Sequence, residues 1–514
     1  MSRRRAGESV PSVPTGLNYS TLEQVSAWRF LRHRIAVAVG RRNVRLVHDP
    51  SKNRSAALLV SSVAAVVGIG VCFIMAFFRP MGLLGNEQIV AARESGELYV
   101  TVDGVMHPAL NLTSARLIVG QAASPRLVPM AKIREYPIGP VVGILGAPND
   151  LEPRTPADTG WALCDRLGST GAQVVPRVAV ITGTATLGDW AHSISSPDAA
   201  LMGYQGDTYL VTEGHRSAID LADKAVTLAL GIPVGGVRPA PMSRALYEAL
   251  IPTAPLRVPE VPNPGGPIGY STPQLPLVSG SVLRVSDVSG DPEFFVALPA
   301  GVQRVPITVA TMIIDAGLVA GAQAIAANAA AVATLPQATG FDISIYPPQP
   351  VRLLDKDSEP VTCVMWRKTS GAPQAQVTTV SGRRLPIPIG DERRVVALVS
   401  AGHPDVADEV YVGADSANFV RVTGMEPDSP RGESLWFIGN NGVRFGIPTA
   451  GNGDEQTRQA LGLELDPAPA PWSVLAWLPV GPALSKGAAL TQHDTLEPDP
   501  NVAVLHTTTP GGTS

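Results

Sequence analysis

The sequence lacks the short motifs that most often identify an enzyme. It contains no G-x-x-x-x-G-K-[ST] loop for nucleotide phosphates, no G-x-S-x-G nucleophile elbow, no H-E-x-x-H zinc motif and no C-x-x-C pair. The nearest approach to a phosphate-binding loop, 481–487 (GPALSKG), places its lysine before the second glycine. The eight histidines are scattered, and the closest group is His403 with Asp405 and Asp408. We therefore predict no catalytic residues, no cofactor and no metal site.

Charged residues (16%) and aromatic residues (5%) are scarce, whereas the chain has 50 glycines and 48 prolines. This composition indicates short strands, many turns and rigid linkers rather than long helices. One segment departs from it, because residues 56–78 (AALLVSSVAAVVGIGVCFIMAFF) carry no charge. As a helix they would extend roughly 34 Å at about 1.5 Å per residue. That length crosses a hydrocarbon core of about 30 Å.

We interpret 56–78 as a transmembrane helix that stays in the mature protein. A buried helix of a soluble core is one alternative, but uncharged runs of this length are uncommon there. A cleaved signal peptide is another, but the run begins more than fifty residues into the chain and no small-residue cleavage site follows it. A second uncharged run, 316–335, is dominated by alanine and interrupted by glycine, glutamine and asparagine. We expect it to form a soluble helix and a linker.

The charges on the two sides of 56–78 are unequal. Residues 1–55 contain eleven Lys/Arg and three acidic residues, whereas 79–514 contain 29 basic and 41 acidic residues. The positive-inside rule then places the N-terminus in the cytoplasm and residues 79–514 outside. The acidic exported part argues against a nucleic-acid partner.

Only three cysteines are present, and Cys72 lies in the apolar run. Cys164 and Cys363 both lie in the exported part, where disulfides form. We expect these two to be joined rather than to remain free thiols. Because they are 199 positions apart, the bond would tie distant parts of the chain into one central domain.

Four segments share a pattern of an aromatic residue in an apolar strand, a glycine turn, a second short strand and a helix. The glycines are Gly104, Gly214, Gly301 and Gly442. A β-hairpin whose turn needs a positive φ, followed by a packed helix, explains the pattern. Chance recurrence in a glycine-rich chain is the alternative, but the agreement at several positions favours four true repeats.

The predicted organisation follows from these features. A basic cytoplasmic segment with an amphipathic helix comes first, and the exported region combines four repeats with a discontinuous central domain. The predicted boundaries are 1–55 (basic segment), 56–78 (transmembrane helix), 86–135 (repeat 1), 136–200 with 336–425 (central domain), 201–262 (repeat 2), 277–335 (repeat 3), 426–495 (repeat 4) and 496–514 (flexible tail).

The basic segment holds a predicted helix within 21–48, where Thr21 and Gln24 form a plausible capping box. Apolar residues recur near helical spacing, and arginines occupy other positions of the same segment. The apolar positions are Leu22, Val25, Trp28 or Arg29, Ile35 and Val39, and the arginines are Arg32, Arg34, Arg41 and Arg42. Such a helix beside a membrane span can lie on anionic lipid, or it can dock on a cytoplasmic partner. The residues that we expect to make a partner contact are Trp28, Arg29, Phe30, Arg32 and Arg34.

Several longer stretches, spread along nearly the whole chain, can be compared with known families. They are QVSAWRFLRHRI (24–35), FFRPMG (77–82), LYVTVDGVMHPALNLTSARLIVG (98–120), RPAPMSRALYEAL (238–250) and PWSVLAWLPVGPALSKGAAL (471–490). In this order they resemble the EccB family, a core membrane component of mycobacterial type VII (ESX) secretion systems. Because they cover nearly the whole chain, the resemblance is specific.

The resemblance implies a bitopic inner-membrane protein with a single N-terminal span. Its elongated α+β periplasmic region would contain a disulfide-linked, β-rich central domain and four small αβ repeat modules. The implied partners are the EccC motor ATPase, EccD, EccE, the MycP protease and membrane lipid, with homo-oligomer formation through the periplasmic region. The implied role is a structural core subunit that forms the periplasmic scaffold and helps to export substrate proteins.

Two other functions stay open from the sequence. Family members are sometimes labelled ATPases, but no loop in this sequence allows nucleotide-binding residues to be carried over. An enzyme that hydrolyses ATP or acts on the cell wall is therefore the alternative to a non-catalytic scaffold. A repeat module that binds peptidoglycan is a third possibility, and it is compatible with the scaffold.

Overall fold

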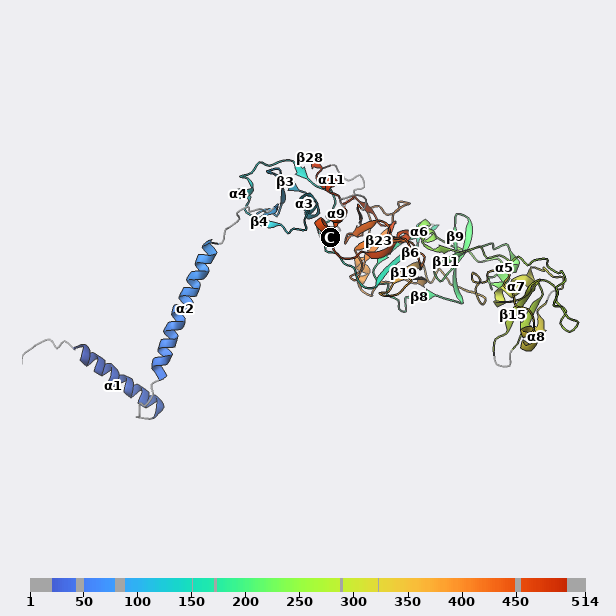
Figure 1. Ribbon diagram of the computed structural model, residues 1–514, viewed down its shortest axis with the longest axis horizontal. Helices are drawn as coiled ribbons and strands as arrows, with labels where there is room; N and C mark the ends of the chain where they lie inside the picture. The colour runs from blue at the N-terminus through green and yellow to red at the C-terminus, as the bar shows by residue number, and fades with distance from the viewer. Residues whose placement is uncertain are drawn as a thin grey trace, which may run out of the picture. The chain divides into compact units, whose positions relative to one another are not determined.

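The computed structural model describes residues 21–42, 50–78, 88–149, 151–170, 173–286, 290–321, 323–448 and 454–496 (Figure 1). The chain divides into two compact units, 1–81 and 82–514. The predicted tail, 496–514, lies outside the described residues except for its first residue.

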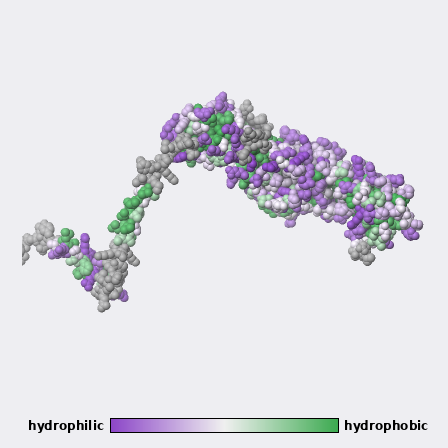
Figure 2. All heavy atoms as spheres, viewed as in Figure 1, coloured by the Kyte–Doolittle hydropathy of each residue, from purple (hydrophilic) through white to green (hydrophobic). Residues whose placement is uncertain are grey.

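The described residues of the first unit form two helices, α1 (Leu22–Arg41) and α2 (Pro50–Phe78). The predicted capping box is present, since Thr21 accepts from the backbone of Gln24 and the Gln24 side chain accepts from the Thr21 N–H. α2 includes the whole uncharged run 56–78, and Figure 2 shows hydrophobic residues along its visible face. The side chains of α2 are described for residues 56–72, and among the described residues no helix has the length and apolarity of a membrane span.

The described residues of the second unit form five sheets, and the central one has seven strands in the order β21-β22-β7-β6-β19-β20-β8. Its strands come from two separate stretches of chain, and a 3₁₀ helix, η1, lies between β20 and β21. The elements are β6 (Thr159–Thr170), β7 (Gln173–Thr182), β8 (Ala191–Ile194), β19 (Val361–Lys368), β20 (Gln376–Gly382), η1 (Asp391–Arg394), β21 (Val396–Ala397) and β22 (Glu409–Val412).

The four smaller sheets of the described residues each belong to a module. Every module combines a three-stranded antiparallel meander, a helix, a further strand and a second short helix. The first two modules share this order. The first has β1 (Ile89–Ala92), β2 (Leu98–Val102), β3 (Val105–Ala109), α3 (Leu112–Val119), β4 (Arg126–Val128), α4 (Met130–Ile133) and β5 (Val141–Val142). The second has β9 (Asp198–Tyr204), β10 (Asp207–Thr212), β11 (His215–Ile219), α5 (Lys224–Ala229), β12 (Ala240–Pro241), α6 (Arg244–Ala249) and β13 (Ile251–Pro252).

The other two modules repeat it. The third has β14 (Val282–Val285), β15 (Glu293–Leu298), β16 (Gly301–Val305), α7 (Ile307–Asp315), β17 (Ile325–Ala327) and α8 (Ala329–Ala333). The fourth has β23 (Phe419–Thr423), β24 (Leu435–Ile438), β25 (Arg444–Ile447), α9 (Asp454–Leu461), β26 (Ala468–Pro471), α10 (Trp472–Leu475) and β27 (Val480–Gly481). Three further elements join these sheets: β18 (Arg352–Leu353) pairs with β9, and α11 (Lys486–Ala489) precedes β28 (Gln492–His493), which pairs with β5.

Two outer strands complete each module, and neither was expected from the sequence. The strand after the first helix pairs in parallel with the first strand of the meander. The chain after the second helix then pairs in parallel with the last strand of the meander. In modules one, two and four this segment is a short strand, and in module three it is the bridge Val302–Gln337. The meander of each module therefore has a parallel partner segment at both of its edges.

Because of these pairings, two modules begin at residues that differ from the predicted domain boundaries. β9 begins at Asp198 and β23 at Phe419, both inside the stretches predicted for the central domain. Within 316–335 the expected helix is also replaced. Ile325–Ala327 form β17, because they pair in parallel with β14, and only the one-turn α8 is helical.

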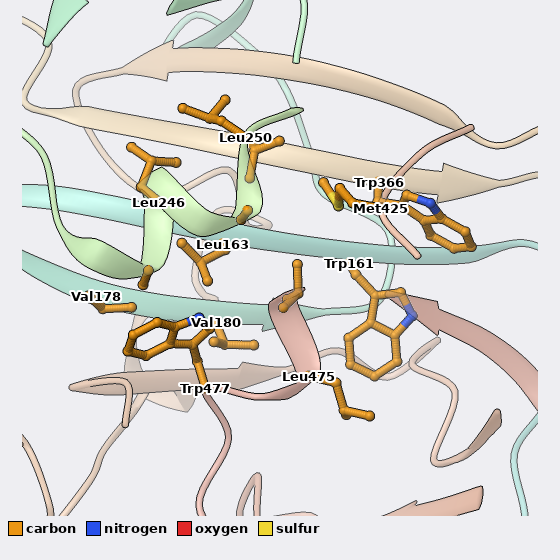
Figure 3. Packing of buried hydrophobic residues seen from close by; sticks show 14 of the residues in the cluster. Trp161, Leu163, Val178, Val180, Leu246, Leu250, Trp366, Met425, Leu475 and Trp477 are labelled. Atoms are coloured by element: carbon orange, nitrogen blue, oxygen red, sulfur yellow. The ribbon is translucent and has the colours of Figure 1, made fainter. Parts of the chain in front are cut away.

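The modules pack through equivalent surfaces. α5 packs against α7, and α3 packs against α9, so the second module adjoins the third and the first adjoins the fourth. The second helices of modules two and four, α6 and α10, cover one face of the central sheet (Figure 3). There Leu246 and Leu475 meet Leu163 of β6, and all three are fully buried. Burying such a side chain contributes about 1.5–3 kcal/mol, so this core holds two modules on the sheet.

Candidate functional site

The expected partner-contact residues of α1 are all exposed. Trp28 is 59% and Phe30 64% exposed, and the Arg32 guanidinium carbon lies 5.0 Å from the centroid of the Trp28 ring. Trp28 and Phe30 are two positions apart, about 200° around a helix. The apolar side chains of α1 therefore do not form one stripe, in contrast to the expected amphipathic pattern.

The disulfide between Cys164 and Cys363 is present. The two residues lie directly opposite each other on β6 and β19, and neither is exposed to solvent. Ala162, Ala179, Val361 and Tyr411 pack around them on the face of the central sheet that α6 and α10 leave free. The bond joins the two stretches of chain that form the central sheet.

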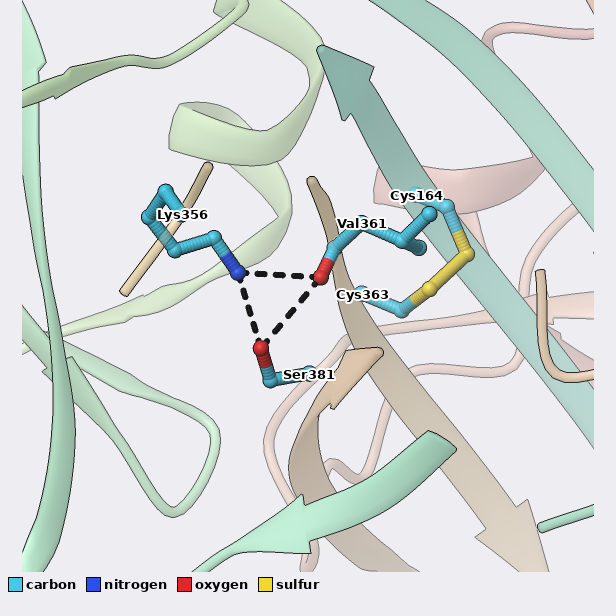
Figure 4. The surroundings of a disulfide bond; sticks show 5 residues. All are labelled: Cys164, Lys356, Val361, Cys363 and Ser381. Atoms are coloured by element: carbon cyan, nitrogen blue, oxygen red, sulfur yellow. Dashed lines mark hydrogen bonds between the residues drawn. A yellow bond between two sulfur atoms is a disulfide. The ribbon is translucent and has the colours of Figure 1, made fainter. Parts of the chain in front are cut away.

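A buried lysine lies beside this bond (Figure 4). Lys356 is 9% exposed, and its Nζ donates to the Val361 carbonyl at 3.0 Å and to Ser381 Oγ at 2.8 Å. Burial lowers the pKa of Lys356 to about 8, although the nearby Glu359 and Asp355 favour its charged form. The ammonium group thus connects the start of β19 to β20.

Asp165, next to the disulfide along β6, is completely buried. Its carboxylate accepts from the backbone N–H of Ser243 at 2.7 Å and from Ser243 Oγ at 2.5 Å. Ser243 is the N-cap of α6, where its Oγ accepts from the Leu246 N–H. Burial raises the pKa of Asp165 to about 7, against the opposing effect of the two hydrogen bonds. The central sheet therefore holds the start of α6 by a carboxyl group.

Arg444 has a similar structural role in the fourth module. Its guanidinium carbon lies 4.6 Å from the Trp436 ring and 5.0 Å from the Trp472 ring. It also donates to the carbonyls of Leu478 and Ala476. Burial lowers the pKa of Arg444 to about 10. Stacking of this kind is favourable when the cation is desolvated, so the arginine joins β25 to the segment after α10.

The four turn glycines all have positive φ angles, at 79° (Gly104), 83° (Gly214), 156° (Gly301) and 82° (Gly442). Two of these turns lie on the central sheet. A Cβ on Gly214 would lie 2.7 Å from Val377 Cγ1, and one on Gly442 would lie 2.6 Å from Val410 Cγ1. The same atom on Gly104 would meet nothing within 4 Å. Modules two and four thus place equivalent turns against β20 and β22.

The acidic residues near His403 have partners elsewhere. Asp405 pairs with Arg244 at 2.9 Å, and Asp408 accepts from the N–H groups of Val178 and Gly402. These contacts hold a loop against β7 and α6. In the parts of the chain that the structure describes, no group of three or more His, Cys, Asp or Glu side chains is placed to hold a metal ion.

Comparison with known proteins places these features in a family. Residues 17–498 match the family model described as "Type VII secretion system ESX-1, transport TM domain B". "ESX-5 secretion system ATPase EccB5" of Mycobacterium tuberculosis H37Rv is 39% identical over 495 residues, which cover 95% of this chain and 97% of the relative. "ESX-3 secretion system ATPase EccB3" of Mycolicibacterium smegmatis is 36% identical over 509 residues, 98% and 96% of the two chains.

Solved structures match over similar lengths. A chain of an intact ESX-5 inner membrane complex superposes with a TM-score of 0.74 at 38% identity, covering 96% of this chain and 99% of that one. The EccB3 dimer from the ESX-3 core complex gives a TM-score of 0.70 at 33% identity, covering 79% of this chain and 100% of that one.

Proposed function

Since this chain belongs to the EccB family of type VII (ESX) secretion proteins, we propose that it is a structural core subunit of an ESX complex in the inner membrane. The observation that carries the proposal is the match to a chain of an intact ESX-5 inner membrane complex along almost its full length. Here the buried Asp165, Lys356 and Arg444 all connect one element to another. Such contacts suit a scaffold.

The proposed topology has one membrane span. The uncharged residues 56–78 within α2 would cross the bilayer, with α1 in the cytoplasm and unit 82–514 in the periplasm. The basic residues before the span and the acidic balance after it support this orientation. The Cys164–Cys363 disulfide supports it as well, because such bonds persist in oxidising compartments.

The proposed partners are the motor EccC, EccD, EccE and the MycP protease, together with further copies of this chain and membrane lipid. A related EccB3 has been solved as a dimer, which supports self-association. The exposed Trp28, Arg29, Phe30, Arg32 and Arg34 of α1 are the proposed cytoplasmic contact.

An ATP-hydrolysing enzyme is the second candidate, because the relatives are named ATPases. The sequence has no G-x-x-x-x-G-K-[ST] loop to hold the phosphates of a nucleotide. A periplasmic body would also face away from the cytoplasmic ATP pool. We therefore prefer the scaffold, and we assign any ATP turnover of the assembly to the motor subunit. Action on the cell wall and binding of peptidoglycan are further alternatives.

Extraction of the tagged chain from its native membrane in mild detergent tests the proposal. We expect an assembly much larger than a dimer that contains EccC, EccD and EccE, identified by mass spectrometry after sizing. A free monomer or homodimer would contradict the scaffold role. Assays of that free protein on ATP and on peptidoglycan would then decide between the alternatives.

A further inference from the structure

A small cavity opens on the same face of the central sheet as the disulfide. Its volume is about 290 Å³. Arg166 of β6 lines it two residues after Cys164, and strand alternation places both on one face. The segment after β20 provides two more arginines, and two glutamates and four apolar residues complete the wall. The lining residues are Arg166, Arg383, Arg384, Leu385, Ile387, Glu392, Val395, Ala397 and Glu409.

The charges around the cavity do not balance. Glu409 is paired with Arg166 and also lies 3.6 Å from the guanidinium of Arg177, so two cations share one carboxylate. Arg383 donates to the backbone carbonyl of Asp189 at 2.9 Å, and among the described residues it pairs with no carboxylate. The three arginines and two glutamates of the lining leave one positive charge in excess, and Arg177, which lies beside Glu409 but does not line the cavity, adds a second. This positive region belongs to a body whose residues 79–514 are acidic overall.

The third arginine is neutralised and held in place. Arg384 pairs with Glu392 at 3.0 Å, and its guanidinium carbon lies 4.6 Å from the Trp190 ring centroid. The second oxygen of Glu392 accepts from the Gly390 N–H. This arginine is therefore oriented beside the cavity.

One donor on the wall has no acceptor. The Nε of Arg166 is buried and lacks a hydrogen-bond partner among the described residues. This nitrogen is closed off from solvent, so a ligand in the cavity would contact the terminal nitrogens of the Arg166 guanidinium instead, since that side chain is 41% exposed. Leu385 and Ile387 are 7% and 5% exposed and form an apolar floor. The cavity thus combines cationic donors with an apolar surface.

We propose that this cavity binds a phosphate monoester on a small apolar or sugar stem. A phosphate monoester carries about −1.5 to −2 charge at pH 7, which matches the excess positive charge, whereas a carboxylate carries one charge. The planar guanidinium groups suit its oxygens. The cavity is at the lower limit of ligand pockets, which span about 300–1,000 Å³, so a small ligand fits and a whole nucleotide does not. This binding is independent of the scaffold role.

Phenyl phosphate is the probe for this site, with benzoate and phenol as comparators. We would titrate each into the full chain in neutral detergent by calorimetry. Phenyl phosphate should bind at least about ten-fold more tightly than benzoate, since its second charge allows a further charge-assisted hydrogen bond to the arginines. Phenol should not bind.

Arg383→Gln is the decisive variant, because Arg383 is exposed and its loss spares the Arg166–Glu409 pair. It should weaken binding of phenyl phosphate at least about ten-fold. Arg284→Gln is the matched control, since this arginine is exposed on β14 of the third module, and it should leave binding unchanged. Equal affinities in the two variants, or no saturable binding of phenyl phosphate at millimolar concentration, would overturn the proposal.

A competition experiment identifies the source of the phosphate. Short-chain phosphatidic acid should displace phenyl phosphate if the ligand is a lipid headgroup. Displacement by glucose 1-phosphate but not by the lipid would assign the site to a soluble or wall-derived ester. Both results support phosphate recognition, whereas displacement by neither would overturn it.

Discussion

Asp165 is buried on β6 and accepts two hydrogen bonds from the N-cap of α6, so its protonation and the packing of that helix are linked. Its pKa is raised to about 7 in the folded chain, against about 3.9 when unfolded. Between these values the folded state binds the extra proton. The free energy of unfolding must then fall as the pH rises from about 4 to about 7.

Asp165→Asn removes this dependence, because the amide keeps the shape and does not titrate. We expect the melting temperature of the wild type relative to the D165N variant to be highest at about pH 4 and to fall steadily towards pH 7.5. Thermal unfolding of both proteins at several pH values provides the test. A constant difference across this range would show that Asp165 is not protonated in the folded protein.

Cys363 offers a second prediction at the residue level. The disulfide closes a loop of 199 residues, for which the chain-entropy model gives up to about 5 kcal/mol. Cys363→Ser should lower the melting temperature of unit 82–514, and so should Cys164→Ser. Cys72→Ser is the matched control, because Cys72 is a free thiol in α2. Equal melting temperatures of oxidised wild type and C363S would contradict a stabilising role.

The sequence predicted the cysteine pair but not the buried charges. Two cysteines in an oxidising compartment usually form a disulfide, so the pairing of Cys164 and Cys363 could be inferred without coordinates. Asp165 and Lys356 could not be recognised in this way, since a charged residue usually faces solvent. Their burial results from α6 lying over one residue and from Ser381 and Val361 enclosing the other.

At the scale of elements, the hairpin turns can be tested in pairs. Gly214 and Gly104 both have positive φ, so alanine at either should cost about 1 kcal/mol. Only Gly214→Ala also meets Val377 of the central sheet, and such overpacking costs about 1–3 kcal/mol more. Denaturant unfolding of both variants measures the difference. Equal losses of unfolding free energy in the two variants would show that the turn of module two does not pack against the central sheet.

The elements of a module differ in whether they leave a local signal in the sequence, and this decides which of them could be predicted. A turn that needs glycine and an aromatic strand before it leave a local signal, so the hairpins and first helices were visible in the sequence. The outer strands were not. β13 and β27 contain two residues each, and they exist because they pair with β11 and β25. No periodicity can be detected in so short a stretch.

At the scale of the whole molecule, the proposed topology predicts which side of the membrane each unit occupies. Ser26→Cys on α1 and Glu260→Cys on the exported unit, both exposed positions, can be introduced into a C72S background. A membrane-impermeant maleimide should label E260C on intact spheroplasts and S26C only after detergent is added. Labelling of S26C on intact cells would contradict a cytoplasmic N-terminus.

The arginines of α1 test whether the proposed cytoplasmic segment contacts a partner or the lipid surface. Reversing Arg29, Arg32 and Arg34 to glutamate should reduce the amounts of EccC and EccD that co-purify with the chain, because each charge contact becomes repulsive. Trp28→Ala with Phe30→Ala is the companion variant, since both rings are exposed and neither change alters the charge. If partners bind here, both variants should lose them. The helix lies on lipid instead if EccC and EccD still co-purify with both variants and the charge reversal abolishes binding of the chain to anionic vesicles.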